Sequence, residues 1–503
     1  MKFLRVTQIQ KYIIWLVILL LTVFTRFYLL ANKPLHFDEG INGWFVLQMK
    51  QMGFYKYDPT NYHGPLYFYL LRAFTALWGH SVEVLRAVPG VFAVLSVMIF
   101  TFNLIQSRII NWSMFFFLFF SPAFLFYGRS GIHEMPFVFF QLLFALGMLR
   151  WYEKSDVTSL GLLLTGFIGM ATLKETFAIT LASWVVGLVF AGPKVLREYF
   201  NFRKIKAAWS RRLTYLVVLL LISFVFLFTG FLRYMPGLFD FVKAFLPWMK
   251  TGVGETGHNK EFLYWVKVLA EAEPLVLFGL GMAIVGLFTK DARLRMVSAF
   301  SLFQFFVYSW IPYKTVWCVL SLVWGFYFVL ALYAQRIFAH RDWQGYLFGS
   351  IVLVGTIGSV RSDWRSVYAQ PIDMSHPYIY VNSTYEMKDL MDMIMATAKD
   401  RPALLTEPVQ MGSKEQWPFP WVFRAFKTHW DLCKDKAIEG AWFYYCDAAG
   451  ENVVESQLTE PFMKIRVMLR QQREVSVLYL KKSIFESVYK GQYETVGLPK
   501  ESQ

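Results

Sequence analysis

The sequence predicts a polytopic α-helical membrane protein of about eleven spans, followed by a small α/β domain outside the membrane. Three observations predict this class. Apolar residues make up 56% of the 503 residues, which is more than an ordinary soluble enzyme carries. Apolar runs of about 20 residues, the length that crosses a bilayer, recur as far as residue 360. Charged and polar residues then become frequent, so we divide the chain into a membrane domain, 1–360, and a soluble domain, 361–503.

The composition also excludes other classes of protein. Low-complexity tracts are absent from the sequence, which argues against disorder, and runs such as MFFFLFFSPAFLFYG are too long for the strands of a membrane β-barrel. The net charge of +15 would suggest nucleic acid in a soluble protein. Here the basic residues fall between the apolar runs, so they indicate topology and contacts with lipid headgroups, and no nucleic-acid partner is expected.

The first apolar run covers residues 12–30 and follows Lys2, Arg5 and Lys11. It resembles a secretory signal, but no small-residue cleavage site follows it, so we interpret it as a retained anchor. The positive residues before it place the N-terminus in the cytoplasm. Residues from 31 onward are therefore expected on the outer side of a prokaryotic plasma membrane.

Ten further apolar runs follow, with ends uncertain by several residues. They cover 82–107, 110–127, 136–152, 158–174, 175–192, 213–232, 268–289, 296–311, 316–335 and 345–360. Alternate loops carry the Lys and Arg residues, most densely in 194–212, as expected if those loops are cytoplasmic. An odd number of spans places the soluble domain outside. Lys174 and Glu175 leave almost no loop between two runs, and a re-entrant pair is the alternative there.

The soluble domain shows short β-like segments alternating with helical ones. Strands are expected at 403–406, 441–445, 465–469 and 475–480, and helices at 385–398 and 456–462. Cys433 and Cys446 fall in this domain, and a disulfide between them and a reduced pair are both open. The aromatic segment QWPFPWVFRAF, residues 416–426, fits either the core of this domain or a surface that binds acceptor or membrane.

An acidic pair follows the first span in the motif HFDEG, where Asp38 and Glu39 lie just outside the membrane. Adjacent carboxylates at an interface are costly unless they are solvated, paired or used. Apolar and aromatic residues follow at 41–49 and 54–57, which predicts an amphipathic helix along the surface. An acid held under such a cover has the environment of a general base, whereas a solvated loop acid is the simpler alternative.

Three motifs together resemble the GT-C glycosyltransferases, in particular the branch of protein O-mannosyltransferases and lipid A aminoarabinose transferases. The motifs are HFDEG, HGPLYFYLLRAF beginning at His63, and YGRSGIHEMPF, which contains Arg129 and Glu134. The resemblance covers roughly residues 1–330 in architecture, although the motifs lie in the first 140 residues. It implies a GT-C-like fold and a sugar donor linked to polyprenyl phosphate.

The resemblance also implies a mechanism and its residues. Asp38 would be the base that takes a proton from the acceptor hydroxyl, with Glu39 beside it, and the sugar would transfer with inversion. The acceptor is expected to be a lipid, a protein or a glycan. Some members of the group use a divalent cation and others do not, and the spacing of the His residues here matches no zinc motif.

A leaving phosphate needs positive charge beside its oxygens, and topology supplies candidates at the outer ends of spans. Arg129, Lys174 and Lys314 are the predicted phosphate ligands, although snorkelling to the interface is the simpler explanation for any single one of them. His63, Glu134, Glu175 and His258 are predicted to bind substrate. Of Glu271 and Glu273, one is expected to face the cavity.

Two other functions fit parts of this pattern. A flippase or transporter of lipid-linked sugars would also need many spans, but its essential charges should lie near the bilayer midplane, not at the outer ends. A membrane scaffold without activity is the third possibility. The enzyme is favoured.

Overall fold

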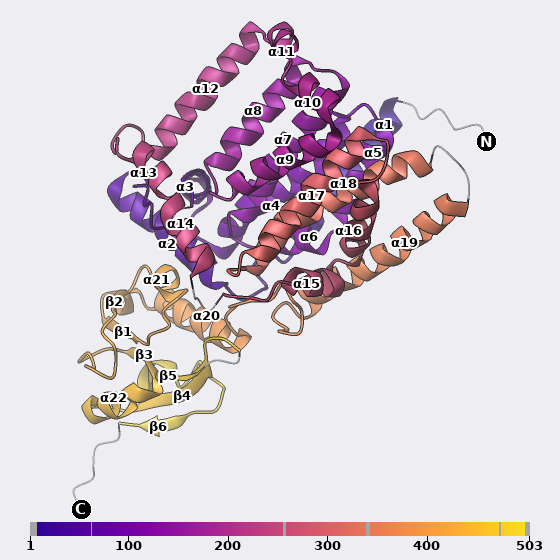
Figure 1. Ribbon diagram of the computed structural model, residues 1–503. Helices are drawn as coiled ribbons and strands as arrows, with labels where there is room; N and C mark the ends of the chain where they lie inside the picture. Colours follow the sequence, from indigo (N-terminus) through magenta and orange to yellow (C-terminus); the bar gives the residue numbers. More distant parts are fainter. Residues whose placement is uncertain (1–7, 62, 255–257, 339–342, 472–473, 498–503) are drawn as a thin grey trace, which may run out of the picture. The chain divides into compact units, whose positions relative to one another are not determined.

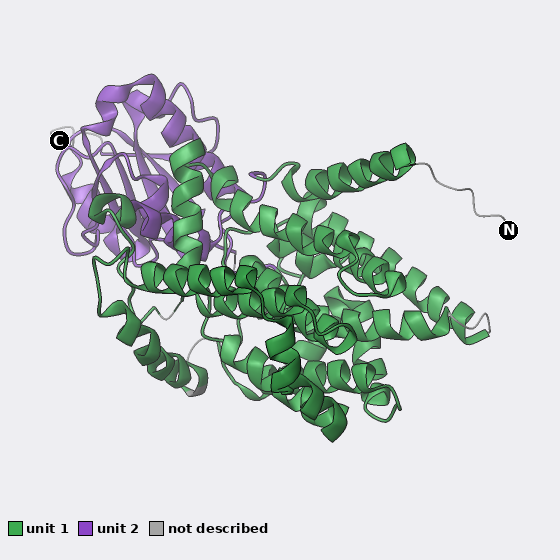
Figure 2. Ribbon diagram, turned by 90° about the horizontal axis from the view of Figure 1, so that it is seen from above, with its two compact units in different colours: residues 1–30, 48–378 green, residues 31–47, 379–503 purple. Residues whose placement is uncertain are grey.

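A computed structural model of the chain describes residues 8–61, 63–254, 258–338, 343–471 and 474–497 (Figure 1). The chain divides into two compact units (Figure 2). Unit 1 comprises Met1–Leu30 and Gln48–Tyr378, and unit 2 comprises Ala31–Leu47 and Ile379–Gln503. The boundary at residue 360 stays a prediction, because this division follows contacts and locates no membrane.

Unit 1 is helical. Its first half contains α1 (Gln8–Phe27), α3 (Leu66–Trp78), α4 (Val82–Met98), η1 (Ile99–Phe102), α5 (Arg108–Phe119), α6 (Pro122–Tyr127), α7 (Glu134–Glu153), α8 (Val157–Ala171), α9 (Phe177–Ala191), α10 (Pro193–Tyr199) and α11 (Phe202–Ala208). Its second half contains α12 (Arg211–Phe228), α13 (Gly237–Lys243), α14 (Phe245–Val253), α15 (Tyr264–Ala272), α16 (Pro274–Gly286), α17 (Ala292–Trp310), η2 (Val316–Cys318), α18 (Val319–Ile337), α19 (Trp343–Asp363) and the π-helical turn η3 (Trp364–Ala369).

Every predicted apolar run forms helix. In the described part of the chain, six helices are long and apolar enough to cross a membrane, and five shorter ones are apolar. The number of spans therefore stays a prediction. The run 110–127 is divided between α5 and α6, because Ser121 caps the N–H of Phe124 and Pro122 begins a new helix.

Helix α18 forms the centre of unit 1. Nearly nine-tenths of its apolar window is buried, whereas α1 and α12 bury about a tenth of theirs or less. Trp324 of α18 donates its indole N–H to Gln141 of α7 at 3.0 Å, and Gln141 donates to Thr180 of α9 at 2.7 Å. These bonds satisfy polar groups that burial in an apolar core would otherwise penalise, and they fix three helices against one another.

Unit 2 contains a mixed six-stranded sheet in the order β2-β1-β3-β5-β4-β6. The strands are β1 (Pro408–Gly412), β2 (Lys427–His429), β3 (Phe443–Asp447), β4 (Phe462–Met468), β5 (Val475–Lys481) and β6 (Glu494–Val496). β1 pairs in parallel with β2 and β3, and the other pairs are antiparallel. The helical elements are α20 (Tyr385–Asp400), η4 (Pro402–Leu405), α21 (Phe419–Val422), η5 (Ala448–Gly450), α22 (Glu451–Gln457) and α23 (Lys482–Phe485).

Two predictions for the tail were wrong. Residues 403–406 form no strand, because Pro402 begins the 3₁₀ turn η4 and β1 starts only at Pro408. The helix predicted at 456–462 ends at Gln457, and β4 begins at Phe462. The helix at 385–398 and the strands near 443, 465 and 475 are confirmed.

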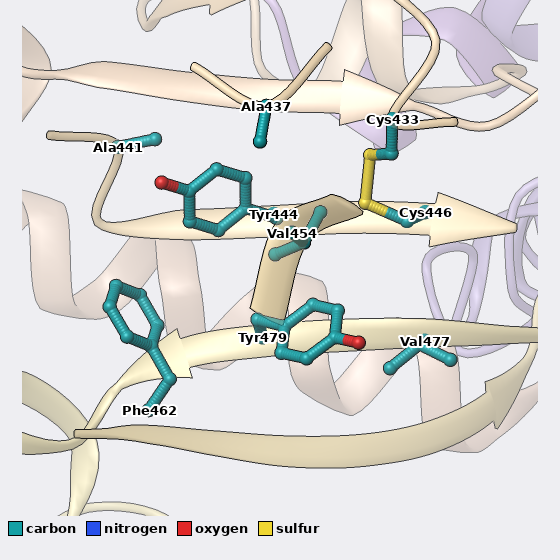
Figure 3. Close-up of a cluster of buried hydrophobic side chains, with 9 residues drawn as sticks. All are labelled: Cys433, Ala437, Ala441, Tyr444, Cys446, Val454, Phe462, Val477 and Tyr479. Atoms are coloured by element: carbon teal, nitrogen blue, oxygen red, sulfur yellow. A yellow bond between two sulfur atoms is a disulfide. The ribbon is translucent and has the colours of Figure 1, made fainter. Parts of the chain in front are cut away.

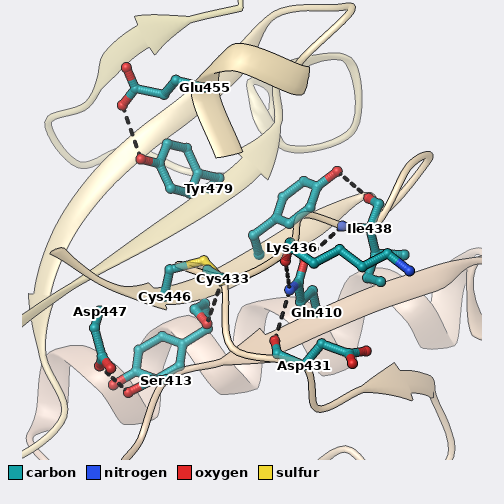
Figure 4. The surroundings of a disulfide bond; sticks show 12 residues. Gln410, Ser413, Asp431, Cys433, Lys436, Ile438, Cys446, Asp447, Glu455 and Tyr479 are labelled. Carbon is teal, nitrogen blue, oxygen red and sulfur yellow. Dashed lines mark hydrogen bonds between the residues drawn. A yellow bond between two sulfur atoms is a disulfide. The ribbon is translucent and has the colours of Figure 1, made fainter. Parts of the chain in front are cut away.

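The core of unit 2 includes the disulfide Cys433–Cys446, which decides the alternative that the sequence leaves open. Figure 3 shows it among buried apolar side chains from β3, β4, β5 and α22. The amide of Gln410 donates to the carbonyls of Asp431 and Lys436 and fixes the loop that carries Cys433 (Figure 4). The aromatic segment 416–426 is mostly core as well, since Phe419, Trp421 and Phe423 are buried.

Helix α2 (Phe37–Met52) starts in unit 2 and confirms the helix expected after HFDEG for residues 41–49. The expectation was wrong for residues 54–57, which follow the end of α2 and are not helical. A side chain at Gly40 would meet Pro418 at 2.6 Å, and one at Gly43 would meet Trp421 at 2.3 Å. These two glycines, one helical turn apart, let the start of α2 pack closely on the segment 417–421. His36 also pairs with Asn382 in an antiparallel bridge.

Candidate functional site

Unit 1 encloses a cavity of about 290 Å³ that four predicted site residues line. The four are His63, Lys174, Glu175 and Lys314. They come from the loop before α3, the α8–α9 connection and the segment between α17 and η2. Aromatic side chains, among them Trp248, Trp265 and Trp317, cover much of the remaining wall. The cavity thus presents a few charges in an apolar enclosure.

A chain of acids and bases lies at one end of this cavity. Lys174 Nζ bonds Glu134 Oε1 at 2.7 Å, and His133 Nε2 lies 3.3 Å from the same oxygen. The rings of His133 and His63 are in contact, tilted by 46° with their centroids 4.0 Å apart, and His63 Nδ1 lies 3.5 Å from Glu175 Oε2. Lys174, Glu134 and Glu175 are each at most 6% exposed. Lys174 and Glu134 compensate each other's buried charge directly, whereas Glu175 Oε2 accepts no hydrogen bond within the described residues and lies only at ion-pair distance from His63.

Lys314 differs from Lys174 in what it contacts. Its ammonium donates to the backbone carbonyls of Ile311 at 2.6 Å and Lys260 at 3.2 Å, and within the described residues no carboxylate pairs with it. An ammonium has three N–H groups, so a third donor remains for a ligand. Burial lowers the pKa of Lys314, and an anion bound beside it would favour the charged form again.

His258 touches the same wall through its backbone. Its carbonyl accepts the N–H of Lys314 at 3.1 Å, and its ring lies 5.1 Å from that of Tyr313. Burial and the neighbouring Lys260 lower the pKa of the His258 side chain, so the imidazole is neutral at pH 7. The residues just before it, 255–257, lie outside the described part of the chain.

Arg129 does not line the cavity. Its guanidinium donates to the carbonyls of Thr25 and Leu29, both at 3.1 Å, and stacks over the ring of Tyr368. It therefore satisfies carbonyls at the C-terminal end of α1, which suits a cation. A role at the donor phosphate stays a prediction for this residue.

Asp38 and Glu39 lie in unit 2, in the first turn of α2. Glu39 is fully buried and its Oε2 accepts the backbone N–H of His36 at 2.9 Å. This is the contact that the third helical residue makes in a capping box. His36 Nδ1 accepts the N–H of Asp38 at 3.1 Å. The Asp38 side chain keeps 31% of its surface exposed, with Oδ2 3.7 Å from His36 Nδ1.

Neither Glu271 nor Glu273 lines the cavity. Glu271 is exposed, whereas Glu273 is fully buried and does not line the cavity. Glu273 accepts hydrogen bonds from the Ser121 hydroxyl, the Ala123 N–H and the hydroxyls of Tyr327 and Tyr378. The expectation that one of the pair faces the cavity was wrong, because Glu273 holds α6, α16 and α18 together instead.

Two further residues near the cavity, His133 and Cys318, were not among the site residues predicted from the sequence. His133 stands between Glu134 and His63, and the Cys318 thiol lies 3.8 Å from Lys174 Nζ. His133 directly precedes Glu134, and that adjacency was the signal available. In the described ranges, no three His, Cys, Asp or Glu side chains are grouped to hold a metal ion. We therefore derive no step through a cation.

The comparison with solved structures bears on the fold that the three sequence motifs indicated. Among solved structures the chain is similar to ArnT from Cupriavidus metallidurans, both in the apo state and bound to undecaprenyl phosphate. The TM-score is 0.59 and the identity 10% in each case, over 94% of this chain and 98% of that chain. No family model matches the sequence, and no curated protein sequence matches it. The resemblance to the lipid A aminoarabinose transferases is thus confirmed as one of fold.

Proposed function

We propose that this protein is an inverting membrane glycosyltransferase that uses a polyprenyl-phosphate-linked sugar as donor. The observation that carries the proposal is the ArnT-like fold over nearly the whole chain, together with a lysine-lined cavity in its helical unit. One of the similar ArnT structures is bound to undecaprenyl phosphate, a polyprenyl phosphate. Fold likeness suggests the reaction type and leaves the sugar and acceptor open.

The cavity in unit 1 suits the phosphate of the donor. Lys314 offers a buried N–H that carbonyls hold in place, and preorganised donors of this kind stabilise charge that develops on a leaving oxygen. Lys174 already neutralises Glu134, so its contribution is weaker unless that pair opens. The positive charges of Lys174 and Lys314 are formally balanced by the negative charges of Glu134 and Glu175. The orientation of the lysine N–H groups, and not a net positive charge, would therefore favour binding of the phosphate. The aromatic walls would cover the apolar part of the donor.

Asp38 is the proposed base on the acceptor. The hydroxyl of the acceptor gives its proton to the Asp38 carboxylate while its oxygen forms a bond to the anomeric carbon. The bond from that carbon to the phosphate oxygen breaks, and the polyprenyl phosphate leaves with the electron pair. Glu39, buried and bonded to the start of α2, is better placed to position Asp38 than to take the proton itself.

The reaction is proposed on the extracytoplasmic side. The Cys433–Cys446 disulfide supports this location for unit 2, since disulfides persist in oxidising compartments and are rare in the cytosol. The basic loops between apolar helices support the same orientation by the positive-inside rule.

The role of Lys314 gives a direct test of the donor site. In membranes supplied with radiolabelled polyprenyl-phosphate sugars, we expect Lys314→Ala to reduce transfer by about 10²-fold, as the loss of one oxyanion donor does elsewhere. Lys314→Arg should retain more activity, and Lys267→Ala, a change at an exposed lysine outside the cavity, none of the defect. Full activity in Lys314→Ala would remove this lysine from the donor site. Movement of lipid-linked sugar across vesicles without transfer would favour a flippase instead.

A further inference from the structure

A second hollow, of about 450 Å³, lies entirely on unit 2 and has no part in the steps described above. We call it the indole groove. Trp44, Trp417 and Trp430 line it, together with the buried residues Phe423 and Phe426. Its volume falls in the range of small-molecule sites, roughly 300–1,000 Å³.

Polar side chains stand among these aromatic rings. Gln416, Arg424 and Thr428 also line the groove and supply both hydrogen-bond donors and acceptors. Arg424 is held in place, with its guanidinium over the Trp421 ring and one N–H on the Trp421 carbonyl at 2.9 Å. Flat apolar faces beside hydrogen-bonding groups match a sugar ring, which presents a face of C–H groups and an edge of hydroxyls. A plain lipid-resting surface would not need these polar groups.

The indole groove is connected to the proposed base through Trp417. The Trp417 ring contacts Trp44, with centroids 6.0 Å apart, and Phe37, with centroids 6.3 Å apart. Phe37 directly precedes Asp38 on α2. The tight packing of Gly40 and Gly43 on the segment 417–421 holds these rings together. A ligand in the groove would therefore lie on the same unit as Asp38 and along the same helix.

We propose that the indole groove binds the carbohydrate part of the acceptor. This inference rests on the proposed function, because it names the acceptor class for the hydroxyl that Asp38 deprotonates. It selects a glycan, or a molecule that carries one, over a bare protein or lipid acceptor.

Trp430 is the best residue for a test. It is 37% exposed, follows the edge strand β2 and makes no ring contact or hydrogen bond within the described residues. Its truncation should therefore leave unit 2 folded. Tyr489, a partly exposed aromatic residue of the same unit outside the groove, provides the matched control.

The experiment measures binding of the full-length protein in detergent to an array of short glucose, mannose, galactose and N-acetylglucosamine oligosaccharides. We expect binding to at least one member, weakened roughly tenfold or more by Trp430→Ala. Trp430→Tyr should restore it, and Tyr489→Ala should leave it unchanged. Thermal unfolding of each variant checks that the fold persists.

Other outcomes would overturn the inference. These are a blank array, or binding that Trp430→Ala does not change. Quenching of Trp430 fluorescence by brominated lipids, recognised by its loss in Trp430→Phe, would make the groove a membrane-resting surface. Sugar transfer without any binding on the array would refute the groove as a glycan site, while the proposed glycosyltransferase activity would still stand. Array binding without transfer would support the groove as a glycan site while refuting the proposed reaction.

Discussion

Individual charged residues in this protein differ mainly in their partners. Lys174 and Lys314 line the same cavity, but Glu134 neutralises the first, whereas two carbonyls hold the second. Asp38 and Glu39 differ in the same way, because Glu39 is buried on the N-terminus of α2 and Asp38 remains partly exposed. The bonding partners of each charged group indicate whether the residue stabilises the fold or is available for chemistry. Residues that are adjacent in the sequence can differ in this respect.

The role of Glu39 can be separated from that of Asp38 by substitution. We expect Glu39→Gln to retain transfer and stability, because the amide oxygen still accepts the N–H of His36. Glu39→Ala should lower the stability of unit 2 by about 1 kcal/mol or more, the usual cost of a lost cap. Thermal unfolding and transfer assays on the same preparations check both. Loss of transfer in a stable Glu39→Gln protein would instead give Glu39 a catalytic role.

Among the elements, the helices of unit 1 are joined by a few buried polar side chains. Glu273 binds four donors from α6, α18 and the segment before residue 379, and Gln141 links α7 to α9 and α18. In an apolar environment such bonds specify which helix faces which, since apolar contacts alone discriminate little.

Removal of the Glu273 carboxylate should therefore loosen unit 1. Glu273→Ala leaves four buried donors without their acceptor, and we expect a cost on the order of 3 kcal/mol or more. The measurement is the midpoint of thermal unfolding in detergent. Glu271→Ala, an exposed change two residues away, should leave the midpoint near that of the wild type. Equal midpoints for the two variants would contradict the assigned role.

The sequence predicted the helices of unit 1 because each needs only a local apolar run. It did not predict contacts between residues that lie far apart in the sequence. Lys174 and Glu134 are 40 positions apart, and nothing local indicates that they pair. Residues 31–47 group with the C-terminal part of the chain through contacts such as His36 with Asn382. The motifs pointed to Glu134 and His63, but not to the contact between the rings of His63 and His133.

At the scale of the whole molecule, the proposed reaction depends on the orientation of the protein in the membrane, with unit 2 on the extracytoplasmic side. A single cysteine introduced by Val488→Cys, at an exposed position of unit 2, should react with an impermeant maleimide in intact cells. Lys154→Cys, an exposed position in a loop predicted to be cytoplasmic, should react only after permeabilisation. The reverse pattern would invert the orientation and remove unit 2 from the oxidising side that its disulfide suggests.

The central claim is that Asp38 takes the proton in glycosyl transfer from a polyprenyl-phosphate sugar. The measurement is transfer of radiolabelled sugar in membranes that contain the wild type or Asp38→Asn at equal, folded amounts. Asparagine keeps the size of the side chain and removes its basicity, so we expect transfer to fall by about 10²-fold or more. Unchanged transfer in Asp38→Asn would contradict the assignment of Asp38 as the base.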